Sequence, residues 1–319
     1  MIPFKRANIL LPKNIDMTKW SVVACDQYTS EMDYWNEVEK IVGASPSTLR
    51  ITLPEIFLED SDVNERINKI NDTMKEYLDE DLFYELKDSM IYLERTQADG
   101  RVREGLMGMV DLEDYSYEKG SQTLIRATEK TVIERIPPRL KVRENALLEL
   151  PHIMILIDDE KKKIIEDLKN EVTDSDVVYD FDLMENGGHI KGYKLNNDSM
   201  TKVEEGLEAL CDKEYFEKKY NVKDKGVLLF SVGDGNHSLA TAKACYENLK
   251  KTMSEEEAKN SLARYALVEV VNLHSDALEF EPIHRVVFGV EPAKMIEEFE
   301  KYYDIYLKTE DMQGLVGEY

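Results

Sequence analysis

Apolar side chains recur along the chain at two spacings, and each spacing predicts a different secondary structure. Within residues 62–88 they return mostly every three or four positions, as from Val63 to Ile67, which is typical of an amphipathic helix. Residues 153–157 and 226–232 are instead short, continuous apolar runs, a pattern favoured in buried strands. The chain is therefore expected to contain both helices and buried strands.

Two segments have the pattern of β-hairpins. Residues 90–112 contain two apolar stretches separated by an Asp-Gly pair, which is a strong turn signal. Residues 177–183 and 189–195 read as strands on either side of an Asn-Gly-Gly turn. The remaining patterns predict strands over residues 21–25 and 265–271, and helices over residues 30–41, 200–212, 239–250 and 292–303, with another helix beginning near Ser254.

Helices and strands that interleave with hairpins indicate a mixed α and β fold. We expect an α+β protein with mixed sheets flanked by helices. A chain of 319 residues suits two domains of roughly 100–200 residues each. We place an N-terminal α+β region at residues 1–150 and a C-terminal α+β region at residues 151–319, the second carrying the candidate site described below.

Composition and charge narrow the classes of function. Asp and Glu total 65 against 41 Lys and Arg, for a net charge of −24, which repels nucleic-acid phosphates and anionic membranes at long range. We therefore expect a small-molecule ligand rather than nucleic acid or a membrane. No apolar run approaches the roughly 20 residues of a membrane span, and the first residues lack the apolar core of a secretory signal. The three cysteines form no CxxC motif and fit reduced thiols, so the expected location is cytoplasmic.

The strongest candidate for chemistry follows the apolar run 226–232. This segment, called here the 233–238 turn, consists of Gly233, Asp234, Gly235, Asn236, His237 and Ser238. Its two glycines permit positive φ, and the predicted helix after it offers unpaired N–H groups and the positive end of a dipole. Strand, turn and helix together predict an anion site in which His237 donates to phosphate or moves a proton. The same residues also suit a structural turn with Asn236 or Ser238 as the helix cap, and spacing alone does not decide between the two interpretations.

Two familiar phosphate-binding motifs do not account for this turn. The P-loop pattern GxxxxGK[ST] is absent from the sequence. The dinucleotide-binding pattern GxGxxG fails at its last position, Ser238. Its acidic residue, about 20 positions further on, would fall at the helix start near Ser254 rather than at the end of a strand. A dinucleotide site is therefore not expected.

Other candidate site residues are spread along the chain. Asp26 and Glu31 follow the predicted strand 21–25, where a carboxylate can act as a general base or bind magnesium, or only cap the next helix. The five histidines lack the HxH or HxxxH spacing of a zinc site. Polar clusters beside predicted turns contain further candidates, namely Arg126, Glu129, Arg139, His189, His284 and Arg285. The arginines among them suit a phosphate, because a guanidinium can donate two parallel hydrogen bonds to its oxygens.

Six short segments lie in one order along nearly the whole chain and carry a resemblance. They are Val-Ala-Cys-Asp-Gln-Tyr at residues 23–28, Glu-Arg-Thr-Gln at 94–97, Ile-Arg-Ala-Thr-Glu at 125–129, Asp-Phe-Asp at 180–182, the 233–238 turn, and Pro-Ile-His-Arg at 282–285. In this order they resemble the family known as domain of unknown function 1015. We therefore identify the chain as a member of that family.

The resemblance carries implications for the fold and the ligand. The family's usual motif at the turn is Asp-Gly-His-His-Arg, which is similar to the phosphate-binding box of the ParB and sulfiredoxin superfamily. That superfamily includes nucleotide hydrolases and ADP-dependent kinases of free serine, so the resemblance implies a ParB/sulfiredoxin-like core with a nucleotide phosphate on the 233–238 turn. In this chain Asn236 and Ser238 replace the first His and the Arg. Arg126, Arg139 or Arg285 would have to supply the missing positive charge.

These observations lead first to a nucleotide-dependent small-molecule phosphotransferase. ATP or ADP would place its phosphates on the 233–238 turn, and Mg²⁺ held by Asp234 or Asp26 would offset their charge. Glu31 or His237 would take the proton of the acceptor hydroxyl, and free serine is the acceptor that the resemblance implies. The alternative hypothesis is a non-catalytic nucleotide- or metabolite-binding protein. A DNA-associated protein of the ParB type fits the acidic net charge poorly.

Overall fold

The computed structural model describes residues 2–129, 136–150, 152–278 and 288–302. The chain divides into two compact units, Met1–Leu278 and Glu279–Tyr319. In the second unit, helix α9 (Pro292–Phe299) begins with its proline in the first turn, which confirms the helix predicted to start there. The first unit contains the elements discussed below. The expected boundary near residue 150 stays a prediction, and strands from both sides of that position enter one sheet.

A mixed sheet of ten described strands forms the centre of the first unit. Its order is β6-β7-β11-β8-β12-β5-β4-β10-β9, with β1 paired to β5. The pairs β6–β7, β7–β11 and β8–β12 are parallel and the others antiparallel. Its strands are β1 (Phe4–Lys5), β4 (Ile91–Thr96), β5 (Val102–Asp111), β6 (Tyr115–Ser116), β7 (Ile125–Ala127), β8 (Met154–Ile157), β9 (Val177–Asp182), β10 (His189–Lys194), β11 (Phe230–Asp234) and β12 (Tyr265–Asn272). The expected mixed α and β architecture, with a large mixed sheet, is confirmed.

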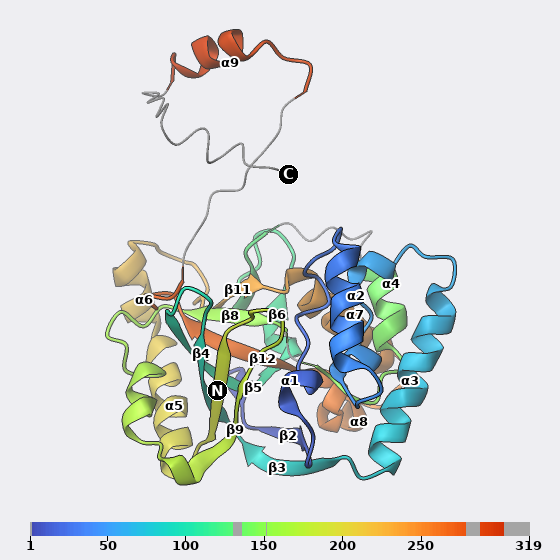
Figure 1. Cartoon of the computed structure of the whole chain (residues 1–319). Coiled ribbons are helices and arrows are strands. Elements are labelled where there is room, and N and C mark those ends of the chain that lie inside the picture. Colours follow the sequence, from blue (N-terminus) through green and yellow to red (C-terminus); the bar gives the residue numbers. More distant parts are fainter. Residues whose placement is uncertain (1, 130–135, 151, 279–287, 303–319) are drawn as a thin grey trace. The chain divides into compact units, whose positions relative to one another are not determined.

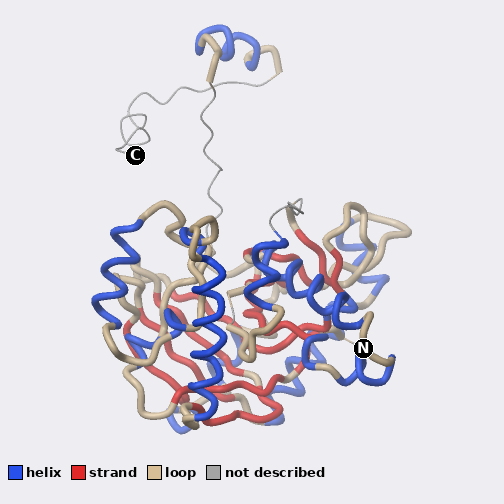
Figure 2. The backbone as a smooth tube through the Cα atoms, turned by 90° about the vertical axis from the view of Figure 1, so that its right-hand side faces the viewer, coloured by secondary structure: helices blue, strands red, loops and turns tan. Residues whose placement is uncertain are grey.

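Helices flank this sheet (Figures 1 and 2). α5 and α6 lie near β9 and β4, at the left of Figure 1, whereas α2, α3, α4, α7 and α8 gather at the right of that view. The bounds in the first unit are α1 (Met17–Trp20), α2 (Met32–Val42), α3 (Val63–Asp79), α4 (Ile136–Arg143), α5 (Asn197–Leu210), α6 (Lys213–Tyr220), α7 (Asn236–Lys250) and α8 (Glu255–Asn260). In the described part of the chain, no helix is both long and apolar enough to span a bilayer.

The main hydrophobic core lies between one face of the sheet and helices α5 and α7. Leu106, Ile155 and Val270 from three adjacent strands are fully buried, and they share a cluster with Leu207 of α5 and Leu239 of α7. Burying a side chain of this size stabilises the fold by about 1.5–3 kcal/mol. The sheet and α7 are therefore held as one packed body, which fixes the junction between β11 and α7.

The two predicted hairpins are confirmed, as β4–β5 and β9–β10. Three expectations need correction. Residues 21–25 form no strand, because the Val22 N–H donates to the Thr48 side chain instead of to a neighbouring strand. The helix predicted over residues 62–88 ends at Asp79, and β3 (Phe83–Ser89) pairs with β2 (Ala7–Pro12) in a separate two-stranded sheet. The strand predicted over residues 226–232 begins only at Phe230.

The β9–β10 turn is expected to be less tolerant of side chains than the β4–β5 turn. Gly188 and Gly100 have φ of +86° and +85°, so alanine strains either position by about 1–2 kcal/mol. A Cβ at Gly188 would also lie 2.0 Å from the Thr96 carbonyl oxygen, whereas a Cβ at Gly100 meets open space. Gly188→Ala should therefore lower the unfolding free energy by roughly 2–5 kcal/mol, which includes an overpacking cost.

Urea denaturation of Gly188→Ala, with Gly100→Ala as the control, measures this difference. A smaller loss in Gly100→Ala is the expected result. Equal losses in the two variants would contradict a tight contact between the β9–β10 turn and the end of β4.

Candidate functional site

The 233–238 turn joins strand β11 to helix α7 at one edge of the sheet. β11 ends at Asp234, and Gly235, with φ of +79°, precedes the first residue of α7. Glycine fits best at position 235 for two reasons. Its φ lies in the left-handed region, which other residues rarely adopt, and a Cβ there would lie 3.0 Å from the Cα of Ile153. The helix has no side-chain cap at this end. Its first N–H groups, which an α-helix leaves without backbone partners, therefore face the turn.

Thr128 clamps the first residue of α7 to the end of β7. Because β7 runs parallel to β11, Thr128 leaves the sheet at the same edge as the turn. The Thr128 N–H donates to Asn236 Oδ1, and Asn236 Nδ2 donates to the Thr128 hydroxyl oxygen, both at 3.3 Å. The hydroxyl in turn donates to the Val232 carbonyl at 2.6 Å. Asn236, which is buried, thus holds the turn in place.

His152 reaches the same edge from the other neighbouring strand. β8 is antiparallel to β11, so its start lies beside the end of β11, with Met154 opposite Asp234. His152 Nε2 and Ser238 Oγ share a hydrogen bond of 2.5 Å. Ser238 occupies the position where the motif of the family that the chain resembles has Arg. The contact therefore brings a histidine, two residues before β8, to that position.

Asp26 approaches the turn from the N-terminal part of the chain. The Cys25 carbonyl accepts from the Glu55 N–H at 2.8 Å, and the Glu55 carboxylate pairs with Arg139 of α4. Oδ1 of Asp26 is buried and has no hydrogen-bond donor within the described residues. Burial, and then the charge of Asp26, raises the pKa of the Cys25 thiol to about 12.

Asp234 lies among carboxylates. Its Oδ1 accepts the N–H of Gly235 at 2.7 Å. Desolvation raises the pKa of Asp234, and the charges of Asp26 and Glu129 raise it further. The hydrogen bond from Gly235 and the charge of His152 oppose this rise. Asp26 and Asp234 both offer carboxylate oxygens, the ligands that divalent cations prefer, and the charge of one acts on the other.

His237 lies on the first turn of α7, next to Glu129. Its Nδ1 is 3.9 Å from Glu129 Oε1, and its ring is mostly buried whereas the carboxylate of Glu129 is largely exposed. The Thr241 hydroxyl donates to its carbonyl at 2.7 Å. A half-buried imidazole beside a carboxylate is suited to holding a proton at the turn.

The structure brings together only part of the predicted site. Glu129 lies beside His237 of the turn, and the charge of Asp26 acts on Asp234. Arg139 pairs with Glu55 and acts through its charge on Asp26. Glu31 is exposed at the start of α2, and its side chain makes no hydrogen bond or ion pair with another described residue. Arg126 donates to the carbonyls of Thr123, Gly226 and Val227. These carbonyls lie before strands β7 and β11, whereas the turn lies at the C-terminal end of β11.

Two further groups of candidates lie elsewhere. His189 is in the β9–β10 hairpin near the far end of the sheet, and its ring nitrogens bond to Asp182 at 2.7 Å and Asp180 at 2.8 Å. These bonds raise the pKa of His189. His284 and Arg285 lie outside the described residues.

Sequence reasoning missed His152 and Thr128 as neighbours of the turn. It also missed Glu55 as the partner of Arg139 and of Cys25, the residue before Asp26. His152 stands directly before the apolar strand at residues 153–157. Thr128 and Cys25 belong to two of the six family-like segments but were not singled out. A prediction that β8 and β7 flank β11 would have identified His152 and Thr128, but that pairing links positions more than 70 residues apart.

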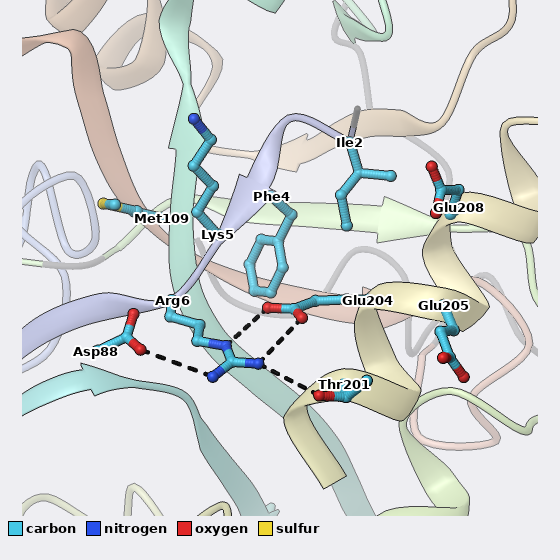
Figure 3. A pocket seen from close by; sticks show the side chains of 10 residues that line it. All are labelled: Ile2, Phe4, Lys5, Arg6, Asp88, Met109, Thr201, Glu204, Glu205 and Glu208. Carbon is cyan, nitrogen blue, oxygen red and sulfur yellow. Dashed lines mark hydrogen bonds and ion pairs between the residues drawn. The ribbon is translucent and has the colours of Figure 1, made fainter. Parts of the chain in front are cut away.

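Two other polar sites lie among the described residues. A groove of about 650 Å³ lies between β1, β5 and α5 (Figure 3), where Arg6 pairs with Glu204 at 2.8 Å and Asp88 at 3.6 Å. None of the predicted site residues lines it. A second cluster, Asp158, Glu160 and His274, has metal-ligand character. Its two carboxylates already bind the ammonium of one lysine, Lys219, at 2.8 and 3.1 Å. We therefore prefer the 233–238 turn to both sites as the candidate functional site.

Comparison with known proteins gives a match to a family model. The family is described as "Protein of unknown function (DUF1015)", and residues 2–317 match it. No curated protein and no solved structure matches the chain. Its activity must therefore be inferred from its own residues.

The carboxylates around the turn predict a pH-dependent effect of Asp234→Asn without ligand. Because the pKa of Asp234 is raised above its ordinary 3.8, the folded state binds this proton more tightly than the unfolded state. Stability is therefore lost as pH rises through the raised pKa, and the loss persists at pH 7. Asp234→Asn should raise the melting temperature at pH 7, and the gain should vanish below about pH 4.

Thermal unfolding at both pH values measures this gain. Asp276→Asn, which removes an almost fully exposed carboxylate paired with Lys162, is the control and should give no gain at pH 7. A lower melting temperature of Asp234→Asn at pH 7 would contradict the repulsion between Asp234 and its neighbours.

Proposed function

The chain belongs to the DUF1015 family, and we propose that it is a nucleotide-dependent small-molecule phosphotransferase whose donor phosphates bind the 233–238 turn. The observation that carries this proposal is the orphaned, buried Oδ1 of Asp26, whose charge acts on Asp234 before the uncapped N-terminus of α7. The resemblance of the turn to the phosphate box of ParB and sulfiredoxin proteins supports it, and a ParB/sulfiredoxin-like core is part of the proposal.

The N-terminus of α7 supplies the donors for the phosphates. α7 is 15 residues long, so its dipole is fully developed and places partial positive charge at the turn. The N–H groups of Asn236, His237 and Ser238 are in the first turn and point out of the helix. The Gly235 N–H is already taken by Asp234, so the binding donors start at Asn236.

A magnesium ion fits the carboxylates beside these donors. Asp26 and Asp234 would hold it, because both offer carboxylate oxygens and one of these oxygens has no other described partner. Bound there, the ion would neutralise phosphate charge that Asp26, Asp234 and Glu129 would otherwise repel. Arg139 does not remove this need, since it is paired with Glu55.

His237 is the side chain that we assign to the acceptor proton. In the transfer, the acceptor hydroxyl oxygen bonds to the terminal phosphorus, the bond from phosphorus to the nucleotide breaks, and the hydroxyl proton passes to His237. His237 is preferred to Glu31 because it belongs to the turn and is mostly buried, whereas Glu31 is exposed at α2. Free serine is the first acceptor to test.

One observation favours the alternative, a binding protein without turnover. Position 238 is a serine bonded to His152, and Arg139 is paired with Glu55. Neither position therefore offers an unpaired arginine to the phosphoryl group during transfer. Transition-state stabilisation by arginine is a large part of many phosphoryl transfers. Binding of nucleotide with no transfer to any acceptor would identify this alternative.

Ligand-induced thermal stabilisation tests the proposal. With Mg²⁺, ADP or ATP at about 100 times its dissociation constant should raise the melting temperature by roughly 5 °C. Asp26→Asn should remove the Mg²⁺-dependent part of this shift. His237→Ala should retain binding but abolish transfer to serine, followed by ³¹P NMR.

Asp33→Asn is the matched control for Asp26→Asn. Asp33 is an exposed acid in the first turn of α2, so its loss changes the net charge equally but leaves the turn intact. An equal nucleotide shift in Asp26→Asn and Asp33→Asn would refute the metal assignment. No shift with any nucleotide, with or without Mg²⁺, would refute the phosphate site itself.

A further inference from the structure

Two arginines face each other across the β4–β5 hairpin, on the sheet face that carries Glu269. Arg95 of β4 and Arg103 of β5 are direct Cα partners in the antiparallel register. Like charges directly opposite each other destabilise a strand pair. A fold keeps such a pair only where something offsets the repulsion.

Glu269 bonds directly to only one of the two guanidinium groups. Arg103 Nε and Nη2 donate to the two oxygens of Glu269 at 3.1 and 3.0 Å, and both side chains are largely buried. Arg95 makes one long hydrogen bond within the described chain, from Nη2 to the Gly187 carbonyl at 3.3 Å. Burial, and then the charge of Arg103, lowers the pKa of Arg95, while the charge of Glu269 opposes this shift. Among the described residues, the cluster therefore holds two guanidinium groups and one carboxylate, and that carboxylate bonds directly to Arg103.

The surroundings of Arg95 are rigid and lie apart from the 233–238 turn. Gly187 and Gly188 belong to the tight turn packed on Thr96, and Glu269 lies directly over Gly105, where a Cβ would be 2.4 Å from its carboxylate oxygen. Four strand spacings separate β4 from β11, or roughly 19 Å at about 4.8 Å each. A ligand the size of an amino acid cannot reach both places.

We infer that Arg95, supported by Arg103, binds a small oxyanion, carboxylate or phosphate, at a second site distinct from the 233–238 turn. Within the described chain, one hydrogen bond is formed by the five donors of the Arg95 guanidinium, and its fork matches two oxygens of such a group. An oxyanion there adds a direct ion pair for Arg95 and balances the second positive charge of the cluster. It also relieves the repulsion between the two arginines.

Isothermal titration with inorganic phosphate and with succinate, each against sodium chloride of equal ionic strength, tests this inference. Wild type should bind at least one of the two, and the one bound identifies the chemistry as phosphate or carboxylate. Arg95→Met should weaken that binding about tenfold or more, as expected for the loss of charged hydrogen bonds. Arg95→Lys, which keeps the charge but not the fork, should weaken it less.

Arg101→Met is the control, because Arg101 lies in the same hairpin beside Asp99 and its loss changes the net charge equally. It should bind as wild type does. Binding of neither anion, or equal binding by Arg95→Met and wild type, would overturn the inference. Because Asp26→Asn does not touch this site, its nucleotide result and the anion result are independent of each other.

The melting temperature of Arg95→Met without anion is a second measurement. An anion-binding role and a purely structural role of Arg95 predict opposite changes in it. Removal of a half-buried charge that has no direct ion pair among the described residues and that Arg103 repels should leave Arg95→Met as stable as wild type or more stable. If Arg95 served only to tie the Gly187 turn to β4, Arg95→Met would lower the melting temperature. A lower melting temperature together with unchanged anion binding would overturn the inference.

Discussion

The site depends on one backbone constraint, the junction of β11 and α7 at Gly235. A single residue with φ of +79°, packed against Ile153, turns the chain from the sheet into the helix. This places the N-terminus of α7 between the end of β7 and the start of β8. The Thr128–Asn236 and His152–Ser238 hydrogen bonds follow from that placement, and each would be lost if the junction moved.

Repulsion between like charges recurs at the places to which we assign ligands. Asp26 and Asp234 repel each other beside the turn, and Arg95 and Arg103 repel each other on the hairpin. Folded proteins usually pair buried charges, because an unpaired one destabilises the fold. Ligands of opposite charge, a cation at the first place and an oxyanion at the second, would restore the balance. Perturbed charges of this kind cluster at functional sites more often than elsewhere.

Local pattern predicted the parts of the fold that are determined locally. The Asp-Gly and Asn-Gly-Gly signals identified both hairpins, and the apolar run before Gly233 identified β11 and the turn. Pairing between distant segments cannot be predicted from local pattern, so the pattern predicts a helix at the residues of β3, which pairs instead with β2. The same limit applies to the site: the residues of the turn are contiguous, whereas His152 and Thr128 arrive through the β8–β11 and β7–β11 registers.

Anomalous diffraction from crystals grown with Mn²⁺ and ADP tests the central claim most directly, because Mn²⁺ scatters anomalously and takes the oxygen ligands of Mg²⁺. The account predicts a peak within roughly 2.1–2.3 Å of carboxylate oxygens of both Asp26 and Asp234, with a phosphate of ADP at the N-terminus of α7. A peak at Asp158, Glu160 and His274 instead, or ADP phosphates bound away from the 233–238 turn, would contradict it.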